Sequence, residues 1–212
     1  MVIAIDGPAG AGKSTVARGV AERLGFTYLD SGAMYRSVAL AALERGVDLD
    51  DPAALGELAE AIDLELEGGR VTLDGTDVSD AIRAPDVSAA ASRVSVHPPV
   101  RAAMVARQRA LIDAGMYVAE GRDIGTVVSP DSPLKVFLTA SDDERARRRA
   151  AETGEHSRDV LVAQSERDLR DREREHGALR AADDAVTIDT TGISASDVAE
   201  RIAGLARERG LA

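Results

Sequence analysis

Residues 7–14 read G-P-A-G-A-G-K-S, which matches the phosphate-loop pattern G-x-x-x-x-G-K-S. The apolar run at 2–5 precedes this loop and predicts a strand, while residues 15–24 carry apolar side chains at helical spacing and end at Gly25. A strand, a glycine loop and a helix in this order are the context that the motif requires. A glycine-rich turn that matches the pattern by chance would not account for the predicted strand before it or the predicted helix after it. The sequence therefore predicts a binding site for a nucleoside triphosphate.

The loop also predicts how the phosphates of that nucleotide are held. Backbone N–H groups and the N-terminus of the following helix supply positive potential. Lys13 is expected to reach the β- and γ-phosphates, and the hydroxyl of Ser14 is expected to ligate Mg²⁺. The predicted nucleotide-binding residues are Gly7, Pro8, Ala9, Gly10, Ala11, Gly12, Lys13, Ser14 and Thr15.

The composition limits the class of protein to which the loop belongs. The chain has 212 residues, a formal net charge of −11 and no cysteine. This length predicts one domain, and the lack of cysteine excludes disulfides and thiolate zinc sites. The acidic balance argues against a general nucleic-acid binder, and no apolar run approaches the length of a membrane span. We therefore expect a cytoplasmic protein that binds neither nucleic acid nor membrane.

Short apolar runs alternate with helical patterns along most of the chain. Strands are predicted at residues 2–5, 26–29, 116–119, 134–138 and 186–188. Helices are predicted at residues 15–24, 33–43, 85–114 (broken at Pro98-Pro99), 141–153, 159–175 and 196–209, with another opened by Asp51-Pro52. The alternation predicts an α/β fold with a five-stranded parallel sheet. Residues 62–83 differ, because alternating apolar residues flank Gly68-Gly69 and predict an inserted β-hairpin.

A phosphate loop alone does not distinguish GTPases, motor ATPases and kinases. A GTPase needs an N-K-x-D loop to read its base, and neither lysine of this chain follows an asparagine. Two arginine-bearing segments, 30–36 and 120–123, follow predicted strands, whose carboxyl ends face the ligand in such sheets. Arg36 alone is equally consistent with a helix surface, but two such loops indicate a second phosphate-bearing ligand. This arrangement is typical of phosphoryl transfer to a small acceptor.

Four stretches in the same order resemble the motifs of bacterial cytidylate kinases, and the similarity extends over nearly the whole chain. They read I-D-G-P-A-G-A-G-K-S-T at 5–15, D-S-G-A-M-Y-R at 30–36, E-G-R-D-I-G-T-V-V at 120–128 and R-D-L-R-D-R-E-R at 167–174. The resemblance implies transfer of the γ-phosphoryl group of ATP to CMP or dCMP with Mg²⁺. It also implies a monomer.

The same resemblance implies the three parts of a nucleoside monophosphate kinase within the single domain. The core is expected at about 1–32, 115–148 and 177–212. A monophosphate-binding region with a small antiparallel sheet is expected at about 33–114, and a short helical lid at about 149–176. The hairpin predicted independently near 62–83 fits the second of these parts.

The resemblance assigns further site residues position by position. The acceptor phosphate is implied to contact Arg36, Arg122 and Arg174, while Arg167 and Asp171 hold the ribose and the transferring phosphate. Ser92, Arg101 and Asp123 are implied to read cytosine, and Ser31 completes the CMP-binding set. The implied catalytic residues are Lys13, Arg122, Arg167 and Arg174.

The helix of residues 159–175 supports part of this assignment, because Arg167, Asp171 and Arg174 lie at positions i, i+4 and i+7 of one face. The alternative is that Asp171 only pairs with these arginines on a solvated helix. Asp123 and Arg101 have structural alternatives too, as a turn cap and as an arginine on the outside of its helix.

Other points stay open in the sequence. Glu120 stands where the family carries Asp, which leaves its part in ordering Mg²⁺-bound water undecided. The lid arginine that covers ATP is Arg145, Arg148 or Arg158. Two other functions also fit the loop: a kinase for another small acceptor such as UMP, AMP or shikimate, and a nucleotide-binding module without catalysis.

Overall fold

The computed structural model describes residues 1–154, 157–174 and 176–212. Six side chains within this range are not described, those of Glu152, Thr153, Ser157, Arg158, Asp159 and Ala163. The chain forms two compact units: unit 1 consists of Met1–Tyr28 with Gly115–Ala212, and unit 2 consists of Leu29–Ala114. The chain therefore leaves unit 1 within one strand and returns to it after a continuous insertion.

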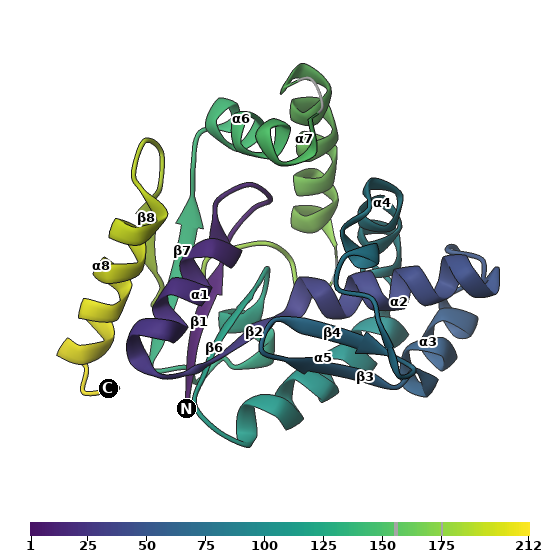
Figure 1. Cartoon of the computed structure of the whole chain (residues 1–212), viewed down its shortest axis with the longest axis horizontal. Coiled ribbons are helices and arrows are strands. Elements are labelled where there is room, and N and C mark those ends of the chain that lie inside the picture. The colour runs from purple at the N-terminus through teal and green to yellow at the C-terminus, as the bar shows by residue number, and fades with distance from the viewer. Residues whose placement is uncertain (155–156, 175) are drawn as a thin grey trace. The chain divides into compact units, whose positions relative to one another are not determined.

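A parallel sheet of five strands organises unit 1 (Figure 1). The strands are β1 (Val2–Asp6), β2 (Thr27–Asp30), β6 (Tyr117–Gly121), β7 (Leu134–Thr139) and β8 (Val186–Asp189), in the order β2-β6-β1-β7-β8. The central strand β1 pairs in parallel with β6 and β7, and β7 pairs in parallel with β8. All five residues of β1 are buried, as a central parallel strand requires. The predicted α/β class and five-stranded sheet are confirmed.

Helices pack against this sheet and against each other. Contacts join α1 (Lys13–Leu24) to β6 and α8 (Ala195–Glu208) to β7, and the two helices also contact one another. Their buried residues share one apolar core with β1. A second helix pair in unit 1 consists of α6 (Asp142–Thr153) and α7 (Ser157–Glu173).

Four helices and a small sheet make up unit 2. The helices are α2 (Ser31–Arg45), α3 (Pro52–Ala61), α4 (Pro85–Val94) and α5 (Pro98–Asp113), and α2 contacts the other three. Aspartates begin the first two helices: Asp30 accepts from the N–H of Ala33, and Asp51 accepts from the N–H groups of Ala53 and Ala54. Short polar side chains thus fix where these helices start, as the sequence predicts for Asp51.

The inserted sheet of unit 2 confirms the predicted hairpin. The strands β3 (Leu64–Glu67) and β4 (Arg70–Leu73) are antiparallel, and β5 (Thr76–Asp77) adds a third strand, followed by the short helix η1 (Ala81–Arg83). Val71 and Leu73 are buried on one face of β4, which matches the alternation in the sequence.

Two local features differ from the sequence-based expectation. The predicted division of residues 85–114 into two helices is confirmed, but the break lies just before Pro98-Pro99, because α4 ends at Val94 and Pro98 is the first residue of α5. Proline is suited to this position, since the first N–H groups of a helix have no intrahelical acceptor. The π-helical turn η2 (Ile124–Val128) after β6 is the second feature, and apolar periodicity gives no signal for it.

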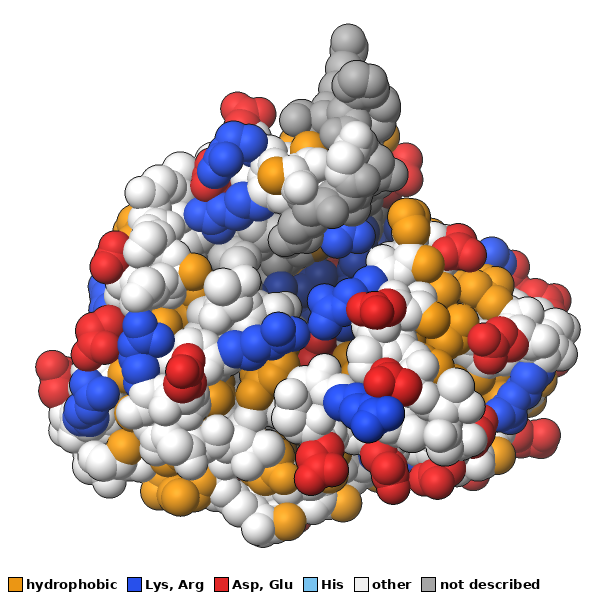
Figure 2. All heavy atoms as spheres, in the orientation of Figure 1, with side chains coloured by type: hydrophobic (Ala, Val, Ile, Leu, Met, Phe, Trp, Pro, Cys, Tyr) orange, Lys and Arg blue, Asp and Glu red, His pale blue; other side chains and the backbone are white. Residues whose placement is uncertain are grey.

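The surface carries both signs of charge. Figure 2 shows acidic and basic side chains interspersed over the visible face. In the part of the chain that the structure describes, no helix combines the length and apolarity needed to cross a membrane.

Candidate active site

The phosphate loop leaves β1 and leads directly into α1. A Cβ atom on Gly7 would lie 2.2 Å from the carbonyl oxygen of Leu138, so only glycine permits this close approach to β7. Gly12 is the N-cap of α1, and because it has no side chain, no side chain caps the helix. The first N–H groups of α1 are therefore oriented for an anion, as the motif predicts.

Lys13 is the first residue of α1 and is buried. Its ammonium group donates to the carbonyl oxygen of Pro8 at 2.8 Å, so the side chain folds back over its own loop. Burial lowers the pKa of Lys13 to about 7, and the positive charge of Arg122 contributes further, against the negative charge of Glu120. A bound anion would favour the charged form again.

Asp171 on α7 pairs with two of the predicted arginines. Arg122 donates from Nε to Asp171 at 2.7 Å and from Nη1 to the carbonyl oxygen of Gly7 at 2.9 Å. Arg174 approaches the other carboxylate oxygen at 3.6 Å. Burial alone would raise the pKa of Asp171, but the charges of Arg122, Arg174 and Arg167 outweigh it and hold the pKa below its usual value. The structure thus brings four predicted site residues together beside the loop.

Asp6 is a residue of this region that sequence analysis did not single out. It ends β1, is buried, and accepts from the N–H groups of Ile124 and Gly125 at 2.8 Å each. Burial raises its pKa to about 6, although both hydrogen bonds oppose that shift. Asp6 thereby fixes the turn that carries Arg122 and Asp123. Its only signal in the sequence is a carboxylate at the end of an apolar strand.

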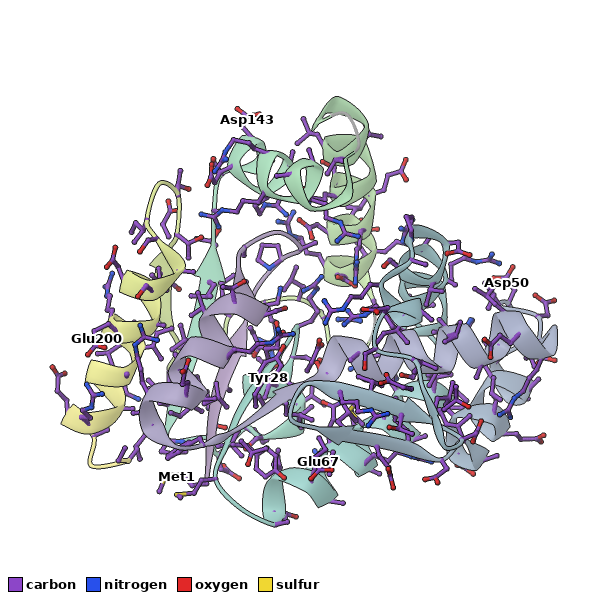
Figure 3. The ribbon with its side chains drawn as sticks, in the orientation of Figure 1. Met1, Tyr28, Asp50, Glu67, Asp143 and Glu200 are labelled. Atoms are coloured by element: carbon purple, nitrogen blue, oxygen red, sulfur yellow. The ribbon has the colours of Figure 1, made fainter. Side chains whose placement is uncertain are left out.

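Glu120 is also buried, at the carboxyl end of β6. The hydroxyl of Tyr28, labelled in Figure 3, donates to Glu120 at 2.5 Å. Glu120 contributes negative charge near Lys13. Its carboxylate is therefore oriented by a phenol and lies within electrostatic reach of the loop lysine.

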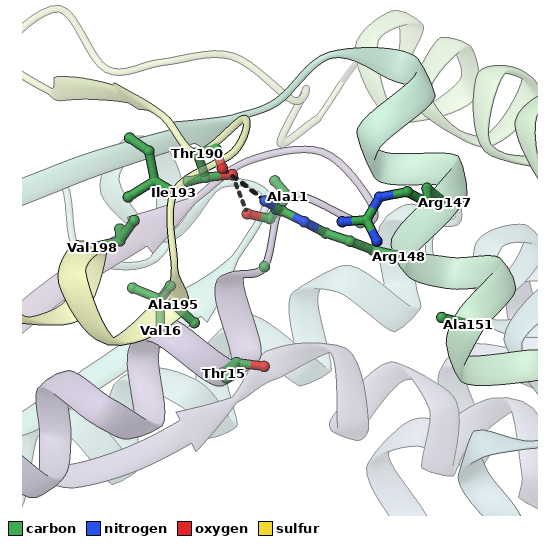
Figure 4. Close-up of a pocket in the computed structure, with 12 residues that line it drawn as sticks. Ala11, Thr15, Val16, Arg147, Arg148, Ala151, Thr190, Ile193, Ala195 and Val198 are labelled. Carbon is green, nitrogen blue, oxygen red and sulfur yellow. Dashed lines mark hydrogen bonds between the residues drawn. The ribbon is translucent and has the colours of Figure 1, made fainter.

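A cavity of about 310 Å³ opens beside the loop (Figure 4). Arg148 donates to the hydroxyl of Thr190 at 3.0 Å and to its carbonyl oxygen at 2.7 Å, and the same hydroxyl donates to the carbonyl oxygen of Ala11 at 3.1 Å. Apolar side chains form much of the remaining lining, among them Val16, Ile193 and Val198. Sequence analysis missed Thr190 and Ile193, since neither belongs to a recognisable motif.

The two candidate lid arginines whose side chains the structure describes, Arg145 and Arg148, have different surroundings. Arg148 lines the cavity, as does Arg147, which sequence analysis had not considered. Arg145 is 4% exposed and donates to Asp168 and to the carbonyl oxygen of Ala9. The side chain of Arg158 lies outside the described residues. Of the described candidates, Arg148 is the one that faces the cavity.

Unit 2 carries the remaining predicted site residues. Ser31 is the first residue of α2, and Arg36 on the next turn donates to Asp30 at 3.0 Å. Ser92 on α4 and Arg101 on α5 are both buried. Arg101 donates to the hydroxyl of Tyr35 at 3.4 Å, and its guanidinium carbon lies 5.9 Å from the centre of that ring. A buried guanidinium with an aromatic neighbour is suited to a planar, hydrogen-bonding ligand.

Comparison with known proteins adds independent findings. The family model of cytidylate kinase matches residues 3–208. The chain is 51% identical to a cytidylate kinase of Solibacter usitatus, with 99% of this chain and 93% of that protein covered. It is 46% identical to one of Rhodopirellula baltica (98% and 93% covered) and 48% identical to one of Pseudomonas aeruginosa (95% and 93% covered).

Solved structures with low sequence identity share the fold. An uncharacterised protein of Eubacterium ventriosum superposes with a TM-score of 0.53 at 14% identity, with 97% of each chain covered. A gluconokinase of Sinorhizobium meliloti reaches a TM-score of 0.50 at 19% identity, covering 99% of this chain and 93% of that one. These two likenesses concern the fold alone.

Proposed function

We propose how this chain, which belongs to the cytidylate kinase family and is therefore an ATP-dependent kinase of CMP, binds its two substrates. The phosphate loop holds the donor, ATP, and the predicted arginines bind the acceptor, CMP. The observation that carries the donor assignment is the cavity of about 310 Å³ that adjoins the loop. Its apolar lining suits a purine ring, and Arg148 lines the same cavity.

The acceptor assignment rests on the charges around Asp171. Arg122, Arg167 and Arg174 supply positive charge for the phosphate of CMP, and Asp171 holds two of these side chains in place. A phosphate that takes over these hydrogen bonds leaves the carboxylate for the ribose hydroxyls. Arg36 adds a further phosphate contact, and Ser31, Ser92, Arg101 and Asp123 complete the proposed CMP-binding set.

Mg²⁺ fits this loop, because Ser14 is exposed at the start of α1 and offers a hydroxyl oxygen. Mg²⁺ keeps several waters and takes few protein ligands when phosphates supply the others. This agrees with the described part of the chain, which contains no cluster of three acidic or histidine side chains suited to a metal. When bound, the ion neutralises charge on the donor phosphates.

In the proposed mechanism an oxygen of the CMP phosphate attacks the γ-phosphorus of ATP, and the bond from that phosphorus to the bridging oxygen breaks to release ADP. Lys13 and the loop N–H groups stabilise charge on the transferring group and on the leaving oxygen. Arg122 and Arg174 align the acceptor and offset the repulsion between two anions. The lid at about 149–176 is proposed to exclude water, the competing acceptor.

A coupled assay with a panel of acceptors tests this function. CMP and dCMP are expected to consume ATP with the highest kcat/KM, above UMP, AMP and shikimate. Preferred use of another acceptor would contradict the assignment, and binding of ATP without turnover on any acceptor would favour the non-catalytic alternative. The monomeric state and the cytoplasmic location stay predictions.

A further inference from the structure

Besides Asp171, two charged side chains of the helix pair α6–α7 are buried. Arg145 on α6 is 4% exposed and Asp168 on α7 is 2% exposed. By contrast Arg147, two residues further along α6, is exposed and pairs with Glu144 of the same helix. Burying both members of an ion pair has a desolvation cost that exposed pairs avoid. Together, Arg145 and Asp168 are called the loop clamp below.

The loop clamp binds the backbone of the phosphate loop. Nη1 of Arg145 donates to Asp168 at 2.5 Å and to the carbonyl oxygen of Ala9 at 2.9 Å. The N–H of Ala9 donates to the other carboxylate oxygen of Asp168 at 3.3 Å. Both backbone polar groups of Ala9 are therefore held by one ion pair, whose members lie on two different helices.

The next residue of the loop touches the same helices. Gly10 has a φ of 75°, and a Cβ atom there would lie 2.9 Å from the carbonyl oxygen of Arg145 and 2.8 Å from Nε2 of Gln164. Gln164 itself donates to that carbonyl oxygen at 3.4 Å. The helix pair thus packs directly against the loop at Gly10, without room for a side chain.

A stabilising role alone does not account for this arrangement. Buried ion pairs contribute little net stability compared with apolar residues of similar volume, whereas they fix geometry through directional hydrogen bonds. The geometry fixed here is that of Ala9 and Gly10, which immediately precede the loop residues whose N–H groups face the phosphates. A change in the conformation of the Ala9 peptide would therefore change the orientation of these N–H groups.

We propose that Arg145 and Asp168 are positioning residues for the phosphate donor: they hold the Ala9–Gly10 segment of the loop in its ATP-binding conformation and couple α6 and α7 to it. Neither residue contacts substrate in this role. The effect of losing the clamp falls on ATP, and CMP binding is altered only indirectly. The kinetic test of this inference, which uses KM values, rests on the proposed kinase function. A second test measures ATP binding alone.

The main test is the substitution Asp168→Asn, which keeps the shape of the side chain and removes its charge. It is expected to raise the KM for ATP by about 10-fold or more, as for the loss of hydrogen bonds to a charged group. The KM for CMP is expected to stay close to that of the wild type. Asp142→Asn is the matched control, because Asp142 accepts from the same arginine at 2.6 Å but its side chain is 71% exposed.

The double variant Arg145→Gln/Asp168→Asn separates positioning from stability. It leaves no unpaired buried charge, so its melting temperature is expected to recover relative to Asp168→Asn, while its KM for ATP stays raised. A double variant with the wild-type KM for ATP would overturn the proposal. If the double variant does not fold, Arg145→Lys takes its place, because lysine retains the charge but lacks the planar guanidinium group. A wild-type KM for ATP in Arg145→Lys would equally overturn the proposal.

Nucleotide binding provides the readout that does not depend on turnover. The rise in melting temperature on adding ATP and Mg²⁺ is expected to be smaller in Asp168→Asn than in the wild type and in Asp142→Asn. An equal rise in all three proteins would contradict the clamp. A wild type that is stabilised by ATP but does not phosphorylate CMP would instead contradict the proposed function and leave this readout valid.

Discussion

The phosphate loop and the proposed acceptor residues of unit 2 are built in opposite ways. The loop is a continuous segment, residues 7–14, and it offers mainly backbone N–H groups with one charged side chain. The proposed acceptor residues of unit 2 are side chains from three helices, with Ser31 and Arg36 on α2, Ser92 on α4 and Arg101 on α5. One site is thus local in the sequence, and the other depends on helix packing.

This difference has a consequence for what single substitutions do. Backbone groups of the loop persist in most variants, so among the residues of the loop itself the loss of donor function is expected to concentrate in Lys13 and in the glycines. Each acceptor side chain is separately replaceable, and its loss is expected to change the use of CMP without changing the affinity for ATP. Predictions for the two regions therefore differ in which substrate is affected.

The largest effect is expected for Lys13→Ala. Loss of the ammonium group removes charge stabilisation at the transferring phosphoryl group, and kcat/KM is expected to fall by about 10³-fold or more, or roughly 4 kcal/mol. Lys135→Met is the matched control, because Lys135 is the only other lysine and pairs with Asp184 at 2.9 Å. A folded Lys13→Ala protein with near-normal turnover would remove Lys13 from the mechanism.

Arg36→Ala is expected to affect the acceptor alone. A charge-assisted hydrogen bond to phosphate is worth about 1.5–3 kcal/mol, so kcat/KM for CMP is expected to fall by roughly 10- to 150-fold. The Kd for ATP is expected to stay near the wild-type value. Arg93→Ala is the control within unit 2, since Arg93 forms an exposed pair with Asp50.

Arg122→Ala is expected to have the same selectivity for the acceptor. Because Arg122 also donates to the carbonyl oxygen of Gly7, a small loss of ATP affinity accompanies the loss of CMP use. Equal losses for both substrates would place these arginines at the donor phosphates instead.

Asp123→Ala tests whether a side chain reads the base. Cytosine offers an N4 amino donor and an N3 acceptor, so a carboxylate paired with an arginine favours it over uracil. The ratio of kcat/KM for CMP to that for UMP is expected to fall by about 10- to 100-fold, at the level of 1–3 kcal/mol per base contact. If both substrates lose the same factor, Asp123 supports the turn and does not select the base.

The pKa of Lys13 predicts that the protein takes up a proton when it binds ATP. Its pKa is lowered from 10.5 to about 7, so at pH 8 most of the free protein carries neutral Lys13. ATP phosphates favour the ammonium form, and binding at pH 8 is therefore expected to take up most of one proton, with affinity falling as pH rises above 7. Calorimetry in two buffers of different ionisation enthalpy measures the uptake. It is expected to vanish at pH 5.5, where Lys13 is already charged, and in Lys13→Met.

The two regions also differ in how far the sequence predicts them. Local patterns predict the phosphate loop, the alternation of strands and helices along the chain, and the hairpin. Each of these features depends on residues that are neighbours in the sequence. Local patterns do not predict the roles of Asp6, Thr190 and the Arg145–Asp168 pair. These roles arise from contacts with residues far away in the chain. Charge spacing on α7 indicated a shared face for Asp171 and its neighbours, yet its shortest contact is to Arg122, on another segment.

The smallest kinetic effects are expected from two helix glycines, and they test whether the acceptor residues depend on packing. A Cβ atom on Gly56 of α3 would lie 2.5 Å from Cβ of Pro99, two residues before Arg101 on α5, while one on Gly204 of α8 would have no neighbour within 4 Å. Gly204→Ala is expected to stabilise the protein by about 0.5–1 kcal/mol, as alanine does within helices, without a change in kinetics.

Gly56→Ala gains the same helix propensity but displaces Pro99, so a net loss of about 1–3 kcal/mol is expected from overpacking. Through the first turn of α5 the displacement is expected to raise the KM for CMP modestly and leave the KM for ATP unchanged. Thermal unfolding with both KM values measures this. A destabilised Gly56→Ala protein with an unaltered KM for CMP would show that the contribution of Arg101 to CMP binding does not depend on how α3 and α5 pack. The contrast between a local donor loop and a packing-dependent acceptor region would then fail at this helix pair.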